Sequence, residues 1–517
     1  MQDSPAYQRR WWILGVLSLS LLIISLDNTI LNVALPSIES DLSASASDLQ
    51  WIVDSYILVF AGLLLTAGSL GDRFGRRRAL VLGLTVFGAG SALSALAGST
   101  DQLIASRALM GVGAAFIMPT TLSVLTNVFP AEERGKAIGI WAAVAGIGVA
   151  VGPITGGWLL EHFEWASVFV VNLPVVAIGL IGAMLLVPES RDPKQSALDP
   201  VGAGLSIVGL TTLVWGIIEA PQRGWGSAGV VAAFAVGAVL LTAFVRWELR
   251  THTPILDVRL FRNGAFSGAS GAIALAFFAL FGTIFFLTQY LQGVLDYTAL
   301  EAGVRTLPVA GGLVLGGPLS ARVAQRIGAR AVVAAGLTTI AAGLALLSQV
   351  EVDSGYGLVA ASMAVFGVGM GAAMAPATES IMSSLPQAHA GVGAAMNDTT
   401  RMVGGSLGVA VLGSLLSSGY RGDMESVTAD LPAQAGAAGD SLGAATAIAE
   451  RVGGDTGAAL ARAADAAFTS AMGDALMIGA AVALAGGALA FKVMPRGMPG
   501  AAPSEATEAR QQEPVAA

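Results

Sequence analysis

The sequence predicts an all-α polytopic membrane protein with fourteen transmembrane helices and both termini in the cytoplasm. The composition, the apolar runs and the distribution of Lys and Arg each favour this fold. Of the 517 residues, 54% are hydrophobic and 12% are Asp, Glu, Lys or Arg, and the mean hydropathy is +0.71. Because soluble proteins carry about 25% charged residues, an ordinary soluble enzyme and a disordered chain are excluded. The net charge of −8 does not indicate a nucleic-acid partner, and the absence of Cys excludes disulfides and Cys-ligated metal.

Fourteen apolar runs are long enough to cross a bilayer core of ~30 Å, which takes about 20 helical residues. They lie at 12–34, 51–70, 80–97, 103–126, 136–159, 166–187, 200–219, 228–246, 266–290, 303–321, 331–349, 357–382, 391–417 and 472–491. A β-barrel is excluded because its strands are alternating segments of ~10 residues. The first run is longer than a signal-peptide core and no small-residue cleavage site follows it, so we expect it to remain as a helix.

Positive charge decides the orientation of these spans. With the N-terminus inside, twenty of the 27 Lys and Arg residues fall on the cytoplasmic side and five outside. The remaining two, Arg107 and Arg401, fall within spans. This asymmetry predicts that both termini lie inside and that the number of spans is even.

An internal repeat indicates how the helices are grouped. Gly68–Arg78 and Gly317–Arg330 both read Gly-x-Leu, then basic residues, then Gly and Arg, and lie eight spans apart. This spacing predicts two parallel six-helix halves, at 1–190 and 251–494, and an inserted helix pair at 191–250.

Two further segments stand apart from the spans. Residues 495–517 are rich in Pro, Ala and Glu, which predicts a disordered cytoplasmic tail. Residues 418–470 form one long outside loop, for which two interpretations stay open. It is either a solvated excursion or contains short helices near 444–452 and 458–468.

Several motifs together resemble one family. The segment Gly68–Arg78 matches the GxLaDrxGrkxx loop of the major facilitator superfamily, and Gly139-x8-Gly148-x3-Gly152-Pro153-x2-Gly156-Gly157 matches its antiporter motif. The segments 26–36, 51–56 and 254–261 are similar to those of 14-helix drug:H⁺ antiporters, in particular the quaternary-ammonium multidrug exporters. The resemblance, over about residues 10–495, implies the major facilitator fold and proton-driven export of lipophilic, often cationic, drugs and dyes. It also implies a multi-pass protein of a bacterial cytoplasmic membrane.

Two of these motifs have a mechanical interpretation. Gly at the spacing of Gly148, Gly152, Gly156 and Gly157 lets a helix lie close to a partner in the other half, and Pro153 bends it. The resemblance implies that this helix seals the outer side. For the basic loop, containing Gly68, Asp72, Arg73, Gly75 and Arg76, it implies a cytoplasmic latch. Asp72 is expected to pair with Arg73 or Arg76, or to cap a helix; anchoring of the loop by its charge is the simpler alternative.

Ionisable groups within the membrane are costly and therefore functional candidates. Asp27 and Arg107 are predicted at similar depths in spans 1 and 4, toward the outside. A carboxyl that alternates between an Arg partner and a desolvated environment binds and releases a proton, as coupling requires. Asp27 is therefore predicted to couple protons, with a static ion pair as the alternative.

Asp54 is predicted one turn into span 2, next to Trp51 and Tyr56. A carboxylate beside aromatic rings suits a lipophilic cation, because the rings add area and cation–π attraction. We therefore predict that Asp54 recognises substrate or couples protons. The alternative is an acid at the membrane interface among its aromatic residues.

Further candidates lie in the second half. Asp398 and Arg401 are three residues apart on one span, and Glu379 lies at a similar depth. The resemblance favours Asp398 as a proton-coupling acid. The alternative is a salt bridge of Arg401, either with Asp398 on the same helix or with Glu379 on another. Phe285, Gln289 and Tyr290 are weaker candidates for the substrate pocket.

The energy source and the reaction class follow from absent motifs. The three lysines precede Ala137, Gln195 and Val493, so the chain has no Walker A motif. No metalloprotease or hydrolase motif is present, and we expect no enzyme activity, catalytic residue, metal or cofactor. An ion gradient is then the simplest energy source. Small-molecule drugs, H⁺ and membrane lipids are the expected partners of a monomer. Alternatives are a dedicated exporter of one metabolite or lipid and a non-transporting sensor or scaffold.

Overall fold

The computed structural model describes residues 5–191, 199–251, 254, 256, 258–384, 390–428 and 437–495. Within these ranges the regular structure is helical, without a strand. The predicted tail lies outside them, except for Pro495. Thirteen helical segments are long and apolar enough to cross a membrane. The predicted span 136–159 falls within a 32-residue helix that is not among the thirteen, so fourteen spans stay a prediction.

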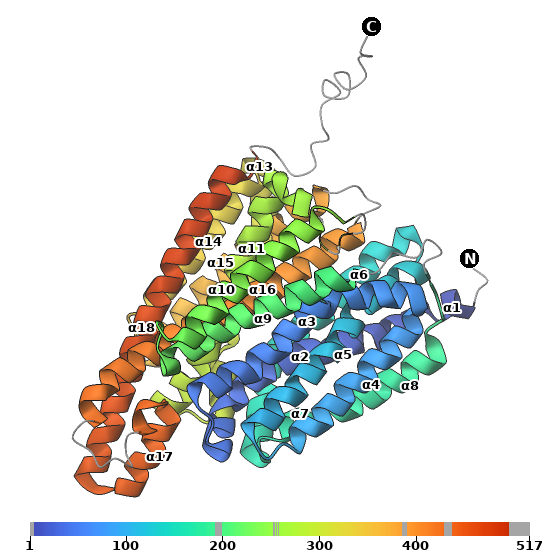
Figure 1. The fold of residues 1–517 in the computed structure, drawn as a ribbon. Coiled ribbons are helices and arrows are strands. Elements are labelled where there is room, and N and C mark those ends of the chain that lie inside the picture. Colours follow the sequence, from blue (N-terminus) through green and yellow to red (C-terminus); the bar gives the residue numbers. More distant parts are fainter. Residues whose placement is uncertain are drawn as a thin grey trace.

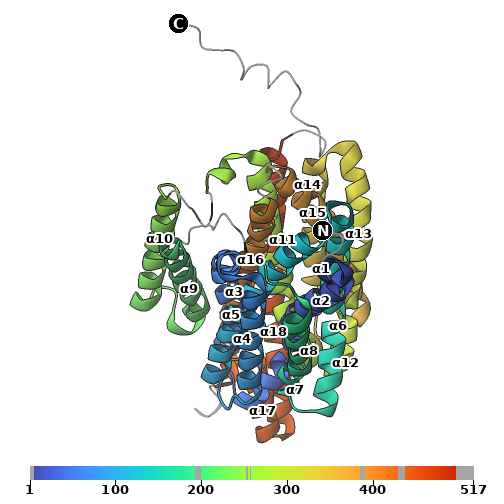
Figure 2. The ribbon, with the colours of Figure 1, turned by 90° about the vertical axis from the view of Figure 1, so that its right-hand side faces the viewer.

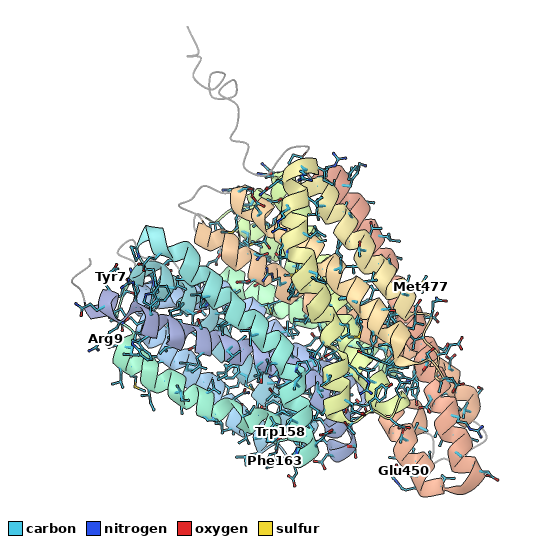
Figure 3. All side chains as sticks on the ribbon, turned by 180° about the vertical axis from the view of Figure 1, so that it is seen from behind. Tyr7, Arg9, Trp158, Phe163, Glu450 and Met477 are labelled. Carbon is cyan, nitrogen blue, oxygen red and sulfur yellow. The ribbon has the colours of Figure 1, made fainter. Side chains whose placement is uncertain are left out.

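The first six long helices pack into an N-terminal half. They are α2 (Arg10–Leu42), α3 (Ala46–Phe74), α4 (Arg76–Ala95), α5 (Thr100–Val128), α6 (Ala131–His162) and α8 (Asn172–Leu186). Short helices α1 (Pro5–Gln8) and α7 (Ser167–Val170) accompany them. Figure 3 places Tyr7 and Arg9 at the opposite end of this half from Trp158 and Phe163. The side-chain surroundings of several α6 positions, including 139, are outside the description.

The last six long segments pack into a C-terminal half. They are α11 (Gly264–Gln289), α12 with α13 (Ala299–Arg305, Leu307–Ile327), α14 (Ala329–Leu347), α15 (Tyr356–Ser383), α16 (Ala390–Thr428) and α18 (Gly454–Val493). A 3₁₀ turn (Val258–Arg262) precedes α11, and a π-helical turn, η2 (Tyr290–Val294), follows it.

The repeated basic loops have the same local geometry in both halves. Gly75 alone separates α3 from α4, and Gly328 alone separates α13 from α14. Both have a positive φ, 120° and 86°, which L residues with a side chain rarely adopt. The glycines of the sequence repeat therefore make equivalent one-residue turns.

The inserted pair, α9 (Pro200–Arg223) and α10 (Ala228–Glu248), lies beside the body, where α9 contacts both α3 and α16 (Figure 2). Pro221 has no N–H for the carbonyl of Ile217 one turn earlier. Ser414 on α16 donates to that carbonyl at 2.7 Å, and Ser47 on α3 donates to the next carbonyl, of Ile218, at 3.2 Å. One turn of α9 thus joins the two halves.

The halves approach each other at the end that carries α7 and α17 (Leu442–Val452) and diverge toward the end that carries α1 (Figure 1). Near the first end, Gln292 donates to the carbonyl of Val33 at 2.9 Å, and the N–H of Gly443 donates to Glu39 at 3.1 Å. The topology predicted from charge assigns this end to the outside. The structure is therefore closed toward the outside.

The segment 418–470 is largely helical where it is described. Helix α16 continues to Thr428, α17 spans Leu442–Val452 and α18 begins at Gly454. Leu442, Ala445 and Ala449 of α17 are buried. The interpretation with short helices therefore fits this segment better than a fully solvated excursion.

Candidate functional site

Asp27 and Arg107 form a buried ion pair between α2 and α5. Arg107 Nη1 donates to Asp27 Oδ2 at 2.6 Å, and the two side chains are 1% and 0% exposed. Arg107 Nε also donates to the carbonyl of Ile52 on α3 at 3.2 Å. The predicted proximity is therefore correct, and the pair joins three helices.

Two further side chains complete this network. Asn172, at the start of α8, donates to Asp27 Oδ1 at 3.0 Å and to Ser91 Oγ at 3.1 Å. The Tyr56 ring centroid lies 4.3 Å from the Arg107 guanidinium carbon, a cation–π distance. Sequence reasoning missed Asn172, although an Asn within the apolar run 166–187 was a usable signal.

Asp54 is also fully buried, on α3, but no cation among the described residues pairs with it. Neither of its carboxylate oxygens has a hydrogen-bond partner among the described residues. Ser406 on α16 lies near this carboxylate, and its hydroxyl also has no hydrogen-bond partner among the described residues. Such a carboxyl is costly as an anion, because nothing compensates its lost hydration.

The predicted group of Asp54, Trp51 and Tyr56 divides over different faces of α3. Tyr56 turns to Arg107, whereas Trp51 packs against an apolar cluster between α3, α9 and α16 that includes Val214 and Ala410. Helical geometry separates Tyr56 from Asp54, because residues two apart point to nearly opposite sides, whereas Trp51 leaves Asp54 through its packing on that cluster. No aromatic cage around Asp54 follows from these contacts.

On α16, Asp398 Oδ1 lies 3.7 Å from Arg401 Nη1, with the side chains 17% and 24% exposed. The alternative of an intrahelical pair is therefore the geometry observed. The Arg401 guanidinium carbon also lies 5.4 Å from the Phe277 ring centroid. Glu379 is exposed and makes no ion pair with a described residue, so the structure does not bring it to this pair.

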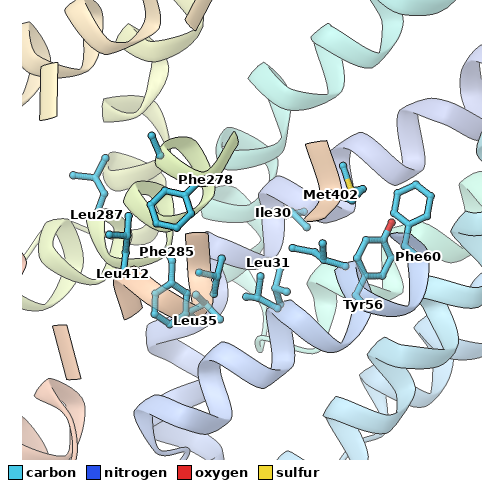
Figure 4. Close-up of a cluster of buried hydrophobic side chains, with 14 of the residues drawn as sticks. Ile30, Leu31, Leu35, Tyr56, Phe60, Phe278, Phe285, Leu287, Met402 and Leu412 are labelled. Carbon is cyan, nitrogen blue, oxygen red and sulfur yellow. The ribbon is translucent and has the colours of Figure 1, made fainter. Parts of the chain in front are cut away.

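The three weaker pocket candidates are buried in the C-terminal half. Phe285 lies beside Leu35 of α2 in the apolar cluster of Figure 4, where Tyr56 and Phe60 also pack. Gln289 donates to the carbonyl of Phe285 at 2.9 Å, and the Tyr290 hydroxyl donates to the carbonyl of Glu351 at 3.0 Å. In this conformation they serve packing and backbone hydrogen bonding.

The antiporter-motif glycines of α6, which are Gly148, Gly152, Gly156 and Gly157, face two different helices. Gly148, Gly152 and Gly156 lie against α2 of the same half, where a Cβ would meet Ser25, Thr29 and Ile30. Of these four described glycines, Gly157 alone faces the other half, against the backbone of Leu300 in α12. Nearby, Gly303 of α12 lies on the carbonyl of Pro153. The expectation that all four glycines face the other half is therefore wrong for three of them, since a helical spacing of four keeps these three on one face.

In the basic loop, Asp72 pairs with Arg76 rather than Arg73, with Nε and Oδ1 2.7 Å apart. Arg73 is exposed, and its guanidinium carbon lies 5.6 Å from the Phe74 ring. Gly68 packs on Pro119 of α5, and Arg76 donates to the carbonyl of Ser123 at 3.4 Å. These contacts all lie within the N-terminal half.

Comparisons with known proteins agree on one group. A profile of the Major Facilitator Superfamily matches residues 17–409. The multidrug efflux pump LfrA of Mycolicibacterium smegmatis is 40% identical over 93% of this chain and 95% of its own. The methyl viologen resistance protein SmvA of Salmonella typhimurium is 34% identical over 89% and 93%. The tetracenomycin C resistance and export protein of Streptomyces glaucescens is 36% identical over 79% and 76%.

Solved structures show the same fold. The chain matches a bacterial homologue of the human lysosomal transporter Spinster, in an inward-facing, unoccupied conformation, with a TM-score of 0.67. The match covers 95% of this chain and 98% of that one at 19% identity, so it bears on the fold alone.

Proposed function

The chain belongs to the Major Facilitator Superfamily, and we propose that it is a proton-coupled antiporter that exports lipophilic, often cationic, drugs and dyes. It is a multi-pass protein of the bacterial inner membrane. Relatives that cover most of its length are an efflux pump and resistance proteins, which supports drug-like substrates. We expect no enzymatic role.

The observation that carries the proton coupling is the buried pair of Asp27 and Arg107. A proton on Asp27 removes the charge that Arg107 compensates, which weakens a contact joining α2, α3 and α5. Loss of the proton restores the ion pair and this contact. Proton binding and helix packing are thereby linked, as an exchanger requires.

Asp54 supplies a second carboxyl without a compensating cation. A lipophilic cation near Asp54 and Ser406 would stabilise the ionised carboxylate, because no described side chain compensates that charge, whereas a bound proton would remove the charge that attracts the cation. Proton and substrate then exclude each other at this carboxyl. Because the carboxyl holds either the proton or the substrate, export of the substrate is coupled to import of the proton.

Alternating access would operate through the contacts between the halves. The outer closure consists of α6 on α12, α2 on α11 and α17, and the α9 bridge. Because both halves and the insert belong to one chain, a monomer contains the whole path. An ion gradient remains the proposed energy source, without a cofactor.

The proposal is tested in everted membrane vesicles energised with a pH gradient. We expect ethidium accumulation that depends on the protein and is abolished by an uncoupler. Correctly inserted protein that moves no cationic dye would favour the dedicated exporter of one metabolite. Absence of any substrate-stimulated proton flux in liposomes, across a panel of drugs, would favour the sensor.

A further inference from the structure

A groove on the membrane-facing side of the N-terminal half has a charged end and an apolar wall. It lies between α4 and α8, which are neighbours at the surface (Figure 1). Its volume is about 480 Å³, and it is lined by Arg77, Arg78, Val81, Leu82, Thr85 and Met184. None of these residues belongs to the network of Asp27 or to Asp54.

The charged end carries excess positive charge. Arg77 and Arg78 share one carboxylate, Glu189, at 3.8 and 3.7 Å, which are long ion-pair distances. Their side chains are 41% and 69% exposed. Both arginines lie in the first turn of α4, where the helix dipole disfavours cations and favours anions. A second anion beside Glu189 would compensate the excess positive charge and would also interact favourably with the helix dipole.

The rest of the groove is apolar and accessible from the bilayer. Leu82 is 49% exposed and Met184 53% exposed. The Thr85 hydroxyl donates to the carbonyl of Val81 in its own helix, so this hydroxyl does not require a polar group of a ligand. From Arg77 to Thr85 the helix rises about 12 Å, which reaches from the headgroup level to the acyl chains.

We propose that this groove binds an anionic phospholipid of the cytoplasmic leaflet. The phosphate lies between the guanidinium groups of Arg77 and Arg78, and one acyl chain lies along Leu82 and Met184. Charge complementarity selects the anionic headgroup, and the length of the apolar wall selects a lipid over a free anion. This inference goes beyond the proposed transport function and does not depend on it.

The second copy of the basic loop provides a control. Arg330, which follows Gly328 as the arginines of α4 follow Gly75, stacks on Phe491 with its guanidinium carbon 3.9 Å from the ring centroid. It therefore has an aromatic partner within its own half. Replacing Arg330 removes one positive charge from the same side of the membrane without touching the groove.

The test is native mass spectrometry of the purified full chain in detergent with phosphatidylglycerol or phosphatidylcholine of the same acyl chains. We expect one phosphatidylglycerol to be retained by the wild type and by Arg330→Gln, but lost from the double variant Arg77→Gln/Arg78→Gln. Met184→Trp, which fills the apolar wall and keeps both arginines, should also lose it. Size-exclusion chromatography shows whether each variant is folded.

Equal phosphatidylglycerol retention by the wild type and the double variant would overturn the proposal. Equal retention of phosphatidylcholine would also overturn it, because charge would then not select the lipid. If inorganic phosphate displaced phosphatidylglycerol, the site would be an anion site and the lipid assignment would be wrong. None of these measurements depends on transport, so their outcome is independent of the exporter proposal.

Discussion

Asp27 and Asp54 lie on neighbouring helices and are equally buried, but they differ in their partners. Arg107 donates to Asp27 at 2.6 Å, whereas Asp54 accepts no hydrogen bond from a described residue. Removing the charge should therefore destabilise the fold at Asp27 but not at Asp54. This difference separates the two groups experimentally even if both are needed for transport.

For Asp27→Asn we expect pH-gradient-driven ethidium export to fall to the level of vesicles without the protein. The substitution leaves Arg107 buried without a counter-charge, which costs about 3–5 kcal/mol of unfolding free energy. Transport and thermal unfolding in detergent measure the two effects. Asp27→Glu, which keeps a carboxylate, should retain part of both. Wild-type export by Asp27→Asn would move the coupling role to Asp54 or Asp398.

For Asp54→Asn we expect transport to fall while the unfolding temperature stays the same or rises. The amide replaces a carboxyl that has no cation to compensate it, so the fold loses no ion pair. Unfolding of this variant is compared directly with that of Asp27→Asn. A loss of stability as large as that of Asp27→Asn would show that Asp54 has a partner in the folded protein.

The bridge formed by α9 predicts that substitutions of Pro221 and Ser414 have non-additive effects on the free energy of unfolding. Ser414→Ala removes the bond to the Ile217 carbonyl and should cost about 0.5–1.5 kcal/mol. In a Pro221→Ala background the cost should be smaller, because the new N–H at position 221 reaches that carbonyl. A double-mutant cycle on unfolding free energies measures the difference.

Ser206→Ala is the matched control, since Ser206 donates only to Ala203 within α9. We expect little effect from this change in either background. Equal costs of Ser414→Ala with and without Pro221 would show that the freed carbonyl does not matter.

Gly157→Ala should open the outer closure, because its Cβ meets the backbone of Leu300 in the other half. Gly204→Ala, where nothing lies within 4 Å, is the control. Asn32 on α2 precedes Val33, whose carbonyl accepts the bond from Gln292 of the other half, and the chain has no Cys, so a single Asn32→Cys reporter needs no other change. A membrane-impermeant maleimide should label this reporter faster from outside with Gly157→Ala than with Gly204→Ala. Equal labelling rates would assign Gly157 to packing alone.

Much of the candidate site was predictable because charges in apolar runs are rare. Asp27, Asp54, Arg107, Asp398 and Arg401 were found on that ground, and the pair of Asp27 and Arg107 followed from their similar depths. Depth along the membrane is countable from sequence, at 1.5 Å per helical residue. Which neighbouring helix a given side chain faces cannot be counted in this way, because it depends on how each helix is rotated about its axis. Tyr56 therefore turned to Arg107 instead of Asp54, and Glu379 is exposed.

The sequence by itself determined the fold class, the repeat and the set of intramembrane charges. These features depend on local chemistry: the length of the apolar runs, the spacing of Gly and Arg, and the cost of burying charge. Only the tertiary structure decided that three glycines of α6 face α2, that Asn172 joins Asp27, and that Pro221 frees a carbonyl for Ser414. Such contacts depend on which helix faces come together across long separations in the chain, and packing of the whole bundle sets this.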